Sequence, residues 1–110
     1  MLLLVLAAQF NPGQAAPARG PIAALFTDRD YPREARKDRL QGVVLPKFTV
    51  GTNGRVTDCK IVQSSGYKIL DDATCNILMK RGRFTPARDS LGRVTIGVIT
   101  GPPITWRYSP

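Results

Sequence analysis

Residues 43–63 read VVLPKFTVGTNGRVTDCKIVQ, in which two apolar runs, 43–50 and 55–63, flank a turn sequence. Both runs are rich in β-branched and aromatic residues, so we expect two strands. Asn53-Gly54 in the connection predicts a hairpin, because both residue types tolerate the positive φ of a tight turn. Pro46 has no backbone N–H, so we expect a bulge or an unpaired ladder position there.

The segment after this hairpin has the pattern of an amphipathic helix. Ser64-Ser65-Gly66 breaks the second strand, and apolar side chains then recur at three- and four-residue spacing over residues 68–81. Acidic residues lie in the first turn of this segment and basic residues in its last turn, which suits the helix dipole. Gly82 follows as the expected stop signal.

The flanking segments complete the predicted fold. Upstream, Pro32 begins a short helical pattern. Downstream, residues 88–92 form a polar turn and residues 94–108 (VTIGVITGPPITWRY) the last strand, in which Gly101-Pro102-Pro103 predicts a bend, a bulge or two short strands. The order predicts an α+β fold: a three-stranded sheet packed by one long helix, with a short N-terminal helix. The helical connection can place the last strand beside the first and parallel to the second, a split βαβ arrangement.

The composition excludes several classes of function. No histidine is present, which removes the commonest general base and most zinc sites, and the two cysteines are too few for an all-cysteine metal site. Asp71 and Asp72 are adjacent on a helix and point to different faces. We therefore predict that the protein is not an enzyme and uses no cofactor or metal.

The charge balance indicates anionic partners. Sixteen Lys and Arg against eight Asp and Glu give a net charge of +8, which attracts nucleic acid, anionic lipid, lipopolysaccharide or acidic protein segments. The same charge also keeps a small domain soluble. Stacking on nucleic acid would need exposed aromatic rings, whereas we expect Phe48, Phe84 and Trp106 in the core. We therefore predict no nucleic-acid partner.

The N-terminal segment indicates export. Residues 1–8 (MLLLVLAA) form an apolar run, and Ala16-Pro17-Ala18 has the form of a signal-peptidase site. The run is shorter than the roughly 20 residues that span a bilayer. We interpret residues 1–18 as a signal peptide or a truncated membrane segment, 19–28 as a linker and 29–110 as the domain. Both interpretations place the domain outside the cytoplasm.

A location outside the cytoplasm affects the expected state of the two cysteines. In an oxidising space Cys59 and Cys75 of a small domain are expected to form a disulfide. The alternative is a pair of buried apolar thiols, one on a strand and one on the helix.

The last strand offers a binding edge. In a three-stranded sheet two strands are edges, and an extended peptide can pair with the free backbone groups of an edge. Pro102 and Pro103 block part of the last strand, so residues 94–100 are the more available part.

An ordered set of short motifs runs through the chain: Tyr31-Pro32 with Ala35, Gly42-x-Val44, Phe48-x-Val50, Asn53-Gly54-x-Val56, Ser64-Ser65-Gly66, Leu70-Asp71-x-Ala73, Phe84-x-Pro86-Ala87 and Gly92. Together they resemble the TonB C-terminal domain family, over most of the chain after residue 18, and imply a TonB/TolA C-terminal-like fold. The cysteine pair resembles a variant in which a disulfide joins strand and helix. Three features of the family are not evident: a long Pro-rich linker, a full membrane anchor and a Gln-Pro element before the Tyr-Pro pair. Arg29-Asp30 stands at the position of the Gln-Pro element.

The resemblance implies a periplasmic module of a Gram-negative bacterium in energy-coupled transport across the outer membrane. Its partners would be the TonB box segments of TonB-dependent outer-membrane receptors, and the ExbB–ExbD complex if a membrane anchor lies upstream. The implied partner-binding residues are Tyr31, Pro32, Val94, Thr95, Ile96, Gly97, Val98, Ile99 and Thr100. Exposed edges also predict a strand-swapped homodimer. The alternative function is a soluble periplasmic adaptor that binds peptidoglycan, lipopolysaccharide or another envelope protein through its basic face.

Overall fold

A computed structural model describes residues 15–108 of the chain. The segment predicted as a signal peptide or membrane segment, 1–18, lies mostly outside these residues, and that interpretation stays a prediction. In chain order the elements are η1 (Ala23–Leu25), η2 (Asp28–Asp30), α2 (Arg33–Lys37), β1 (Gly42–Val50), β2 (Val56–Gln63), α3 (Lys68–Arg81), β3 (Ala87–Arg88), β4 (Val94–Thr95), β5 (Gly97–Thr100) and β6 (Ile104–Trp106).

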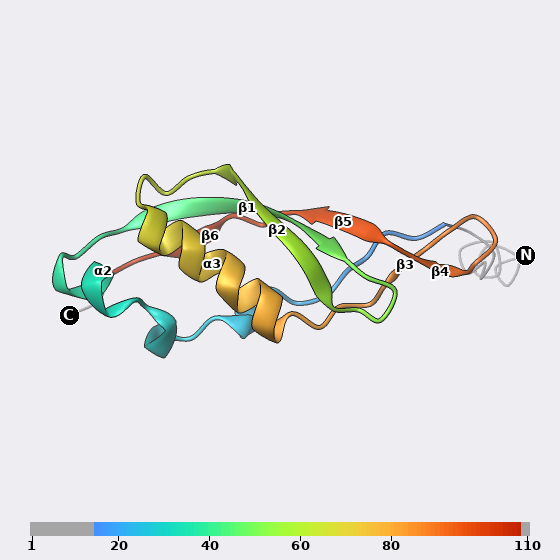
Figure 1. The fold of residues 1–110 in the computed structure, drawn as a ribbon, viewed down its shortest axis with the longest axis horizontal. Helices are drawn as coiled ribbons and strands as arrows, with labels where there is room; N and C mark the ends of the chain where they lie inside the picture. Colours follow the sequence, from blue (N-terminus) through green and yellow to red (C-terminus); the bar gives the residue numbers. More distant parts are fainter. Residues whose placement is uncertain (1–14, 109–110) are drawn as a thin grey trace, which may run out of the picture.

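The main sheet has β1 at its centre (Figure 1). β2 pairs antiparallel with one edge of β1, and β5 and β6 both pair antiparallel with β1, so β5 runs parallel to β2. β5 pairs with residues 47–50 of β1 and β6 with residues 42–44. The predicted split βαβ arrangement is confirmed. Gly101-Pro102-Pro103 separates β5 from β6, which confirms the alternative of two short strands.

The β1–β2 hairpin differs from the expected tight turn. The register shifts between Leu45 and Pro46, which confirms the predicted bulge. Gly54 has a φ of +83°, whereas Asn53 does not have a positive φ. The N–H of Gly51 donates to the carbonyl of Arg55 at 2.8 Å, so three residues form the loop and only the last needs a left-handed backbone. Asn53 contributes through its side-chain oxygen, which accepts a hydrogen bond from the Arg55 N–H at 3.0 Å.

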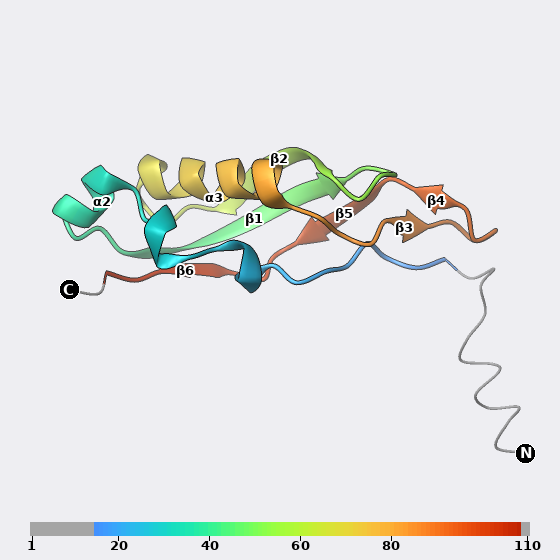
Figure 2. The same ribbon diagram turned by 90° about the horizontal axis from the view of Figure 1, so that it is seen from below.

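α3 covers one face of the sheet, as the two ribbon views show (Figures 1 and 2). Its bounds agree with the predicted segment, and the N–H of Gly82 closes its last turn on the carbonyl of Leu78. The predicted core aromatic residues are confirmed as buried, with exposed fractions of 1% for Phe48, 7% for Phe84 and 6% for Trp106. The predicted disulfide between Cys59 on β2 and Cys75 on α3 is also confirmed, with a Cα–Cα distance of 5.6 Å.

The start of α3 explains one of the recurring motifs. The carboxylate of Asp71 accepts hydrogen bonds from the hydroxyls of Ser64 and Ser65 and from the N–H of Ser65. Burial raises the pKa of Asp71, but these hydrogen bonds outweigh burial and leave the pKa below its ordinary value. The Ser-Ser-Gly and Leu-Asp motifs therefore act together to fix the connection from β2 into α3.

The segment predicted as one last strand begins in a second, smaller sheet. Val94–Thr95 is β4 and pairs with β3, whereas pairing with β1 starts only at Gly97. The chain therefore changes partner at Ile96, and the prediction of a single strand from residue 94 was wrong. The hairpin between β3 and β4 closes through Asp89, whose side chain accepts hydrogen bonds from the N–H groups of Leu91 and Arg93.

The residues before η2 pack against the domain. We call residues 15–31 the N-terminal lead. Ala16 forms a bridge with Arg88, and Arg19 forms one with Thr85, so the lead runs along the segment that contains β3. Ile22 is only 5% exposed and belongs to the core. Most of the segment predicted as a linker, 19–28, is thus in contact with the folded domain.

Candidate functional site

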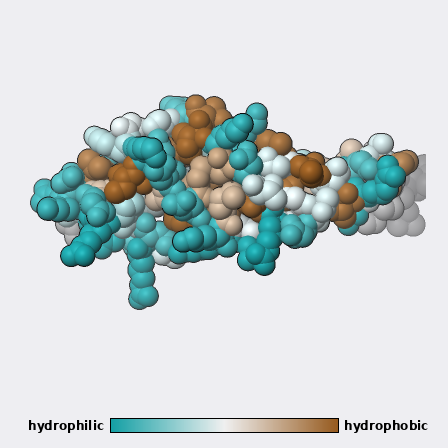
Figure 3. All heavy atoms as spheres, in the orientation of Figure 1, coloured by the Kyte–Doolittle hydropathy of each residue, from teal (hydrophilic) through white to brown (hydrophobic). Residues whose placement is uncertain are grey.

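The outer edge of β5 is the candidate binding site. β5 is the last strand in the order β2-β1-β5, and among residues 15–108 no backbone hydrogen bond joins its outer edge to another segment. Ile96, just before β5, is 64% exposed and Val98 is 54% exposed. In Figure 3 separate hydrophobic spots lie over the part of the molecule that contains β4 and β5, among intermediate and hydrophilic surface. The edge therefore offers free backbone groups beside apolar side chains.

The register on β1 determines which way the β5 side chains point. Ile99 lies opposite Phe48 and packs with it against the core, whereas Val98 lies opposite Thr49 and points to the face without α3. Thr100 pairs with Lys47 at the end of the strand. Alternation of this kind leaves every second side chain of β5 for solvent or a partner.

Gly97 lies where β5, β3 and the lead meet. A Cβ atom at position 97 would lie 2.7 Å from the Cβ of Ala87 and 3.1 Å from that of Ala18. Any larger residue would therefore push β3 or the lead away from the start of β5. Thr95, two residues earlier, pairs with Ala87 and holds the same junction from β4.

Tyr31 and Pro32 lie beside β6, at the end of the molecule opposite to β4. The Tyr31 ring meets Trp106 of β6 edge-on, with 5.4 Å between centroids, and its hydroxyl donates to the carbonyl of Leu40. Burial raises the pKa of Tyr31. Both ribbon views place α2, which follows Pro32, at the end of the molecule far from β4 (Figures 1 and 2). The structure thus gathers residues 94–100 along one line but does not bring Tyr31 and Pro32 to it.

Buried hydrogen bonds join α3 to the part of β6 that Tyr31 contacts. The indole N–H of Trp106 donates to the hydroxyl of Thr74 at 2.9 Å, and that hydroxyl donates to the carbonyl of Leu70 at 2.9 Å. A hollow of about 210 Å³ lies between the lead and β6. Its lining residues are Phe26, Thr27, Asp28, Tyr31, Ile104, Thr105, Trp106 and Arg107.

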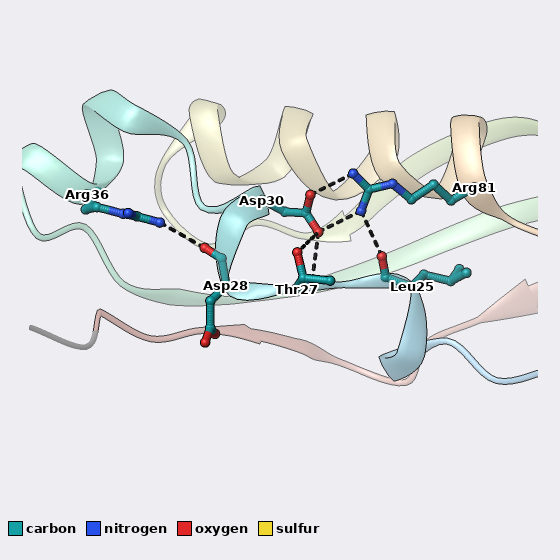
Figure 4. A network of polar contacts seen from close by, with 6 residues as sticks. All are labelled: Leu25, Thr27, Asp28, Asp30, Arg36 and Arg81. Carbon is teal, nitrogen blue, oxygen red and sulfur yellow. Dashed lines mark hydrogen bonds and ion pairs between the residues drawn. The ribbon is translucent and has the colours of Figure 1, made fainter.

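A network that the sequence predictions missed holds the lead on α3 (Figure 4). Arg81 donates to both carboxylate oxygens of Asp30 at 2.7 Å and to the carbonyl of Leu25 at 3.0 Å. Thr27 and Asp30 form a capping box around η2. The hydrogen bond from Arg81 is the main cause that lowers the pKa of Asp30 to about 2. The Thr-x-x-Asp spacing was the signal in the sequence that could have indicated this cap.

Neither α2 nor α3, the α-helices of residues 15–108, has the length and hydrophobicity of a membrane-spanning helix.

A long helix on an antiparallel sheet whose strand β5 has a free outer edge defines this chain as a small α+β domain. A family model described as the Gram-negative bacterial TonB protein C-terminal region matches residues 27–108. The chain therefore belongs to the TonB C-terminal family, which confirms the resemblance of its motifs.

Relatives support the same family. The chain is 28% identical over 90 residues to Protein TonB of Helicobacter pylori strain J99, which covers 81% of this chain and 32% of that protein. It is 31% identical over 80 residues to Protein TonB of Pseudomonas putida, covering 72% and 33%. The chain spans about a third of the length of these curated relatives.

A solved structure supports the fold. The solution structure of the Helicobacter pylori TonB C-terminal domain is 25% identical with a TM-score of 0.55, over 81% of this chain and 78% of that one.

Proposed function

We propose that this domain works in the periplasm in energy-coupled transport across the outer membrane, where it binds an extended receptor segment by strand addition at β5. The observation that supports this most directly is the free outer edge of β5 in a chain of the TonB C-terminal family. Coupling to ExbB–ExbD would require a membrane anchor before the domain, and we propose it only for a protein with that anchor.

Strand addition has consequences for both backbone and side chains. The added segment would take its backbone hydrogen bonds from residues 97–100, which pair with β1 on their other side. Its alternate side chains would lie beside Val98, which is 54% exposed. We propose that Val94, Thr95 and Ile96 extend this surface along β4, whereas Tyr31 and Pro32 support β6 through Trp106 and contact only the far end of a long segment.

The test is titration of the isotope-labelled full chain with peptides from receptor N-termini, followed by amide NMR shifts. We expect shifts concentrated on residues 97–100. A peptide of the same sequence with alternate backbone nitrogens methylated cannot donate those hydrogen bonds, and we expect it to bind at least tenfold more weakly, because several hydrogen bonds of about 1 kcal/mol are lost. Equal binding of both peptides would contradict strand addition.

A matched pair of variants tests which edge of the sheet binds the peptide. Val98 on β5 and Val62 on β2 are 54% and 55% exposed, and they lie on strands at the two edges of the sheet. We expect Val98→Lys to weaken peptide binding and Val62→Lys to leave it unchanged. The reverse result would move the site to the outer edge of β2.

A further inference from the structure

We propose that the end of the molecule formed by the β3–β4 hairpin docks on an anionic phospholipid surface. We call this end, with Leu91, Val94 and Ile96 as its apolar side chains, the hairpin end. Leu91 in the turn is 68% exposed, Val94 39% and Ile96 64%. Figures 1 and 2 show that the β3–β4 hairpin projects beyond the main sheet, so its turn, which contains Leu91, lies at an extremity of the described chain. Ile96 lies where the hairpin joins β5.

The cations on the hairpin and on the segments beside the start of β3 have few acidic partners. Arg19, Arg55, Arg83 and Arg88 are exposed, and none of them forms an ion pair within residues 15–108. The nearest acid along the hairpin, Asp89, is already paired with Arg93 at 3.0 Å. This part of the surface therefore carries uncompensated positive charge, which attracts lipid phosphates.

Two of these arginines face each other across a backbone bridge. Arg55 and Arg83 form an antiparallel bridge, so they lie directly opposite each other. Like charges at opposed positions repel, because such side chains start only about 5 Å apart. Arg83 donates to the carbonyl of Gly82 at 2.8 Å, but that bond leaves the charge in place. A lipid phosphate that contacts both side chains would reduce this repulsion.

Apolar and basic side chains are also interleaved at the hairpin itself. Arg88 lies opposite Val94 in the β3–β4 pair and donates to the carbonyl of Gly92 at 2.7 Å. An acidic protein would need the cations alone, whereas a membrane interface takes apolar side chains into the boundary region and cations at the headgroups. The exposed Leu91 in the turn therefore favours lipid over an acidic polypeptide.

The test is co-sedimentation of the full chain with phosphatidylcholine vesicles that contain or lack 30% phosphatidylglycerol. We expect binding to the anionic vesicles that falls steeply with salt. Arg55→Gln with Arg83→Gln should weaken it at least tenfold, because each basic residue near the surface is worth roughly fivefold. Leu91→Ser should weaken it roughly threefold, because a partly inserted leucine is lost.

Matched controls separate this site from net charge and from residues 1–8. Arg29→Gln with Arg33→Gln removes the same charge at the α2 end, and Val62→Ser removes an exposed apolar side chain from β2, so both should bind as the unmodified chain does. Guanidinium unfolding checks that each variant is folded. The proposal is overturned if anionic vesicles are not bound, if the controls lose as much binding, or if soluble polyglutamate competes fully and Leu91→Ser has no effect.

Discussion

The ion pair between Asp30 and Arg81 gives a pH-dependent prediction. Asp30 is the inner partner, with a side chain 9% exposed, whereas that of Arg81 is 48% exposed. We expect Asp30→Asn to lower the free energy of unfolding at pH 7. The change keeps the shape and the side-chain oxygen that Thr27 needs for the cap, so it removes mainly the charge.

The magnitude follows from the pKa. Lowering the pKa of Asp30 from 3.8 to about 2 on folding corresponds to about 2.4 kcal/mol in the free energy of unfolding at pH 7. Because Arg81 is half exposed and screened by solvent, we expect about 1 to 2 kcal/mol. The folded pKa is depressed, so this stability is present above the unfolded value and is lost as pH falls. About half of the difference between the two proteins should be gone by pH 3.

The assay is urea unfolding of both proteins between pH 7 and pH 3, followed by the fluorescence of Trp106. Asp72→Asn is the control, because Asp72 pairs with Lys68 where both side chains are mostly exposed and should change stability little. A difference between Asp30→Asn and the unmodified chain that is the same at pH 7 and pH 3 would refute the assigned role of the charge.

Three further predictions concern stability and are measured by the same unfolding assay. Reduction of Cys59–Cys75, which closes a separation of 16 residues, should cost about 3 kcal/mol, and Cys59→Ser with Cys75→Ser should cost a similar amount and be insensitive to reductant. Gly54→Ala should cost more than Gly66→Ala, because both have positive φ but only at position 54 would a Cβ lie 2.3 Å from the carbonyl oxygen of Phe84; equal costs would contradict this. Thr74→Val should cost about 1 to 3 kcal/mol, because it leaves the buried N–H of Trp106 without its partner, and a neutral effect would mean that this hydrogen bond contributes nothing.

Local signals made much of the fold predictable. α3 was predicted with its bounds because periodic apolar residues, charged ends and Gly82 all act within one segment. The bulge at Pro46 followed from the missing N–H of proline. The pairing of Cys59 with Cys75 followed from the inferred compartment rather than from any local geometry.

Features that depend on long-range pairing were not predictable in the same way. The sequence VTIGV across residues 94–98 is uniformly strand-like, and nothing in it marks the change of partner at Ile96. Residues 19–28 were interpreted as a linker, and nothing in their composition indicates that the carbonyl of Leu25 accepts a hydrogen bond from Arg81, 56 residues further along the chain. The separation of Tyr31 from β5 likewise depends on the path of the lead beneath the sheet, which no local pattern encodes.

The two proposed surfaces share Val94 and Ile96, because the hairpin end contains both residues and the proposed receptor surface extends over them. If the hairpin end lies on lipid, a receptor segment can pair with residues 97–100 but cannot also cover residues 94–96. A short peptide that pairs with residues 97–100 alone should therefore bind equally well with and without anionic vesicles. A longer peptide that also covers residues 94–96 should bind more weakly when the vesicles are present. Equal binding of the longer peptide in both settings would mean that the two surfaces act independently.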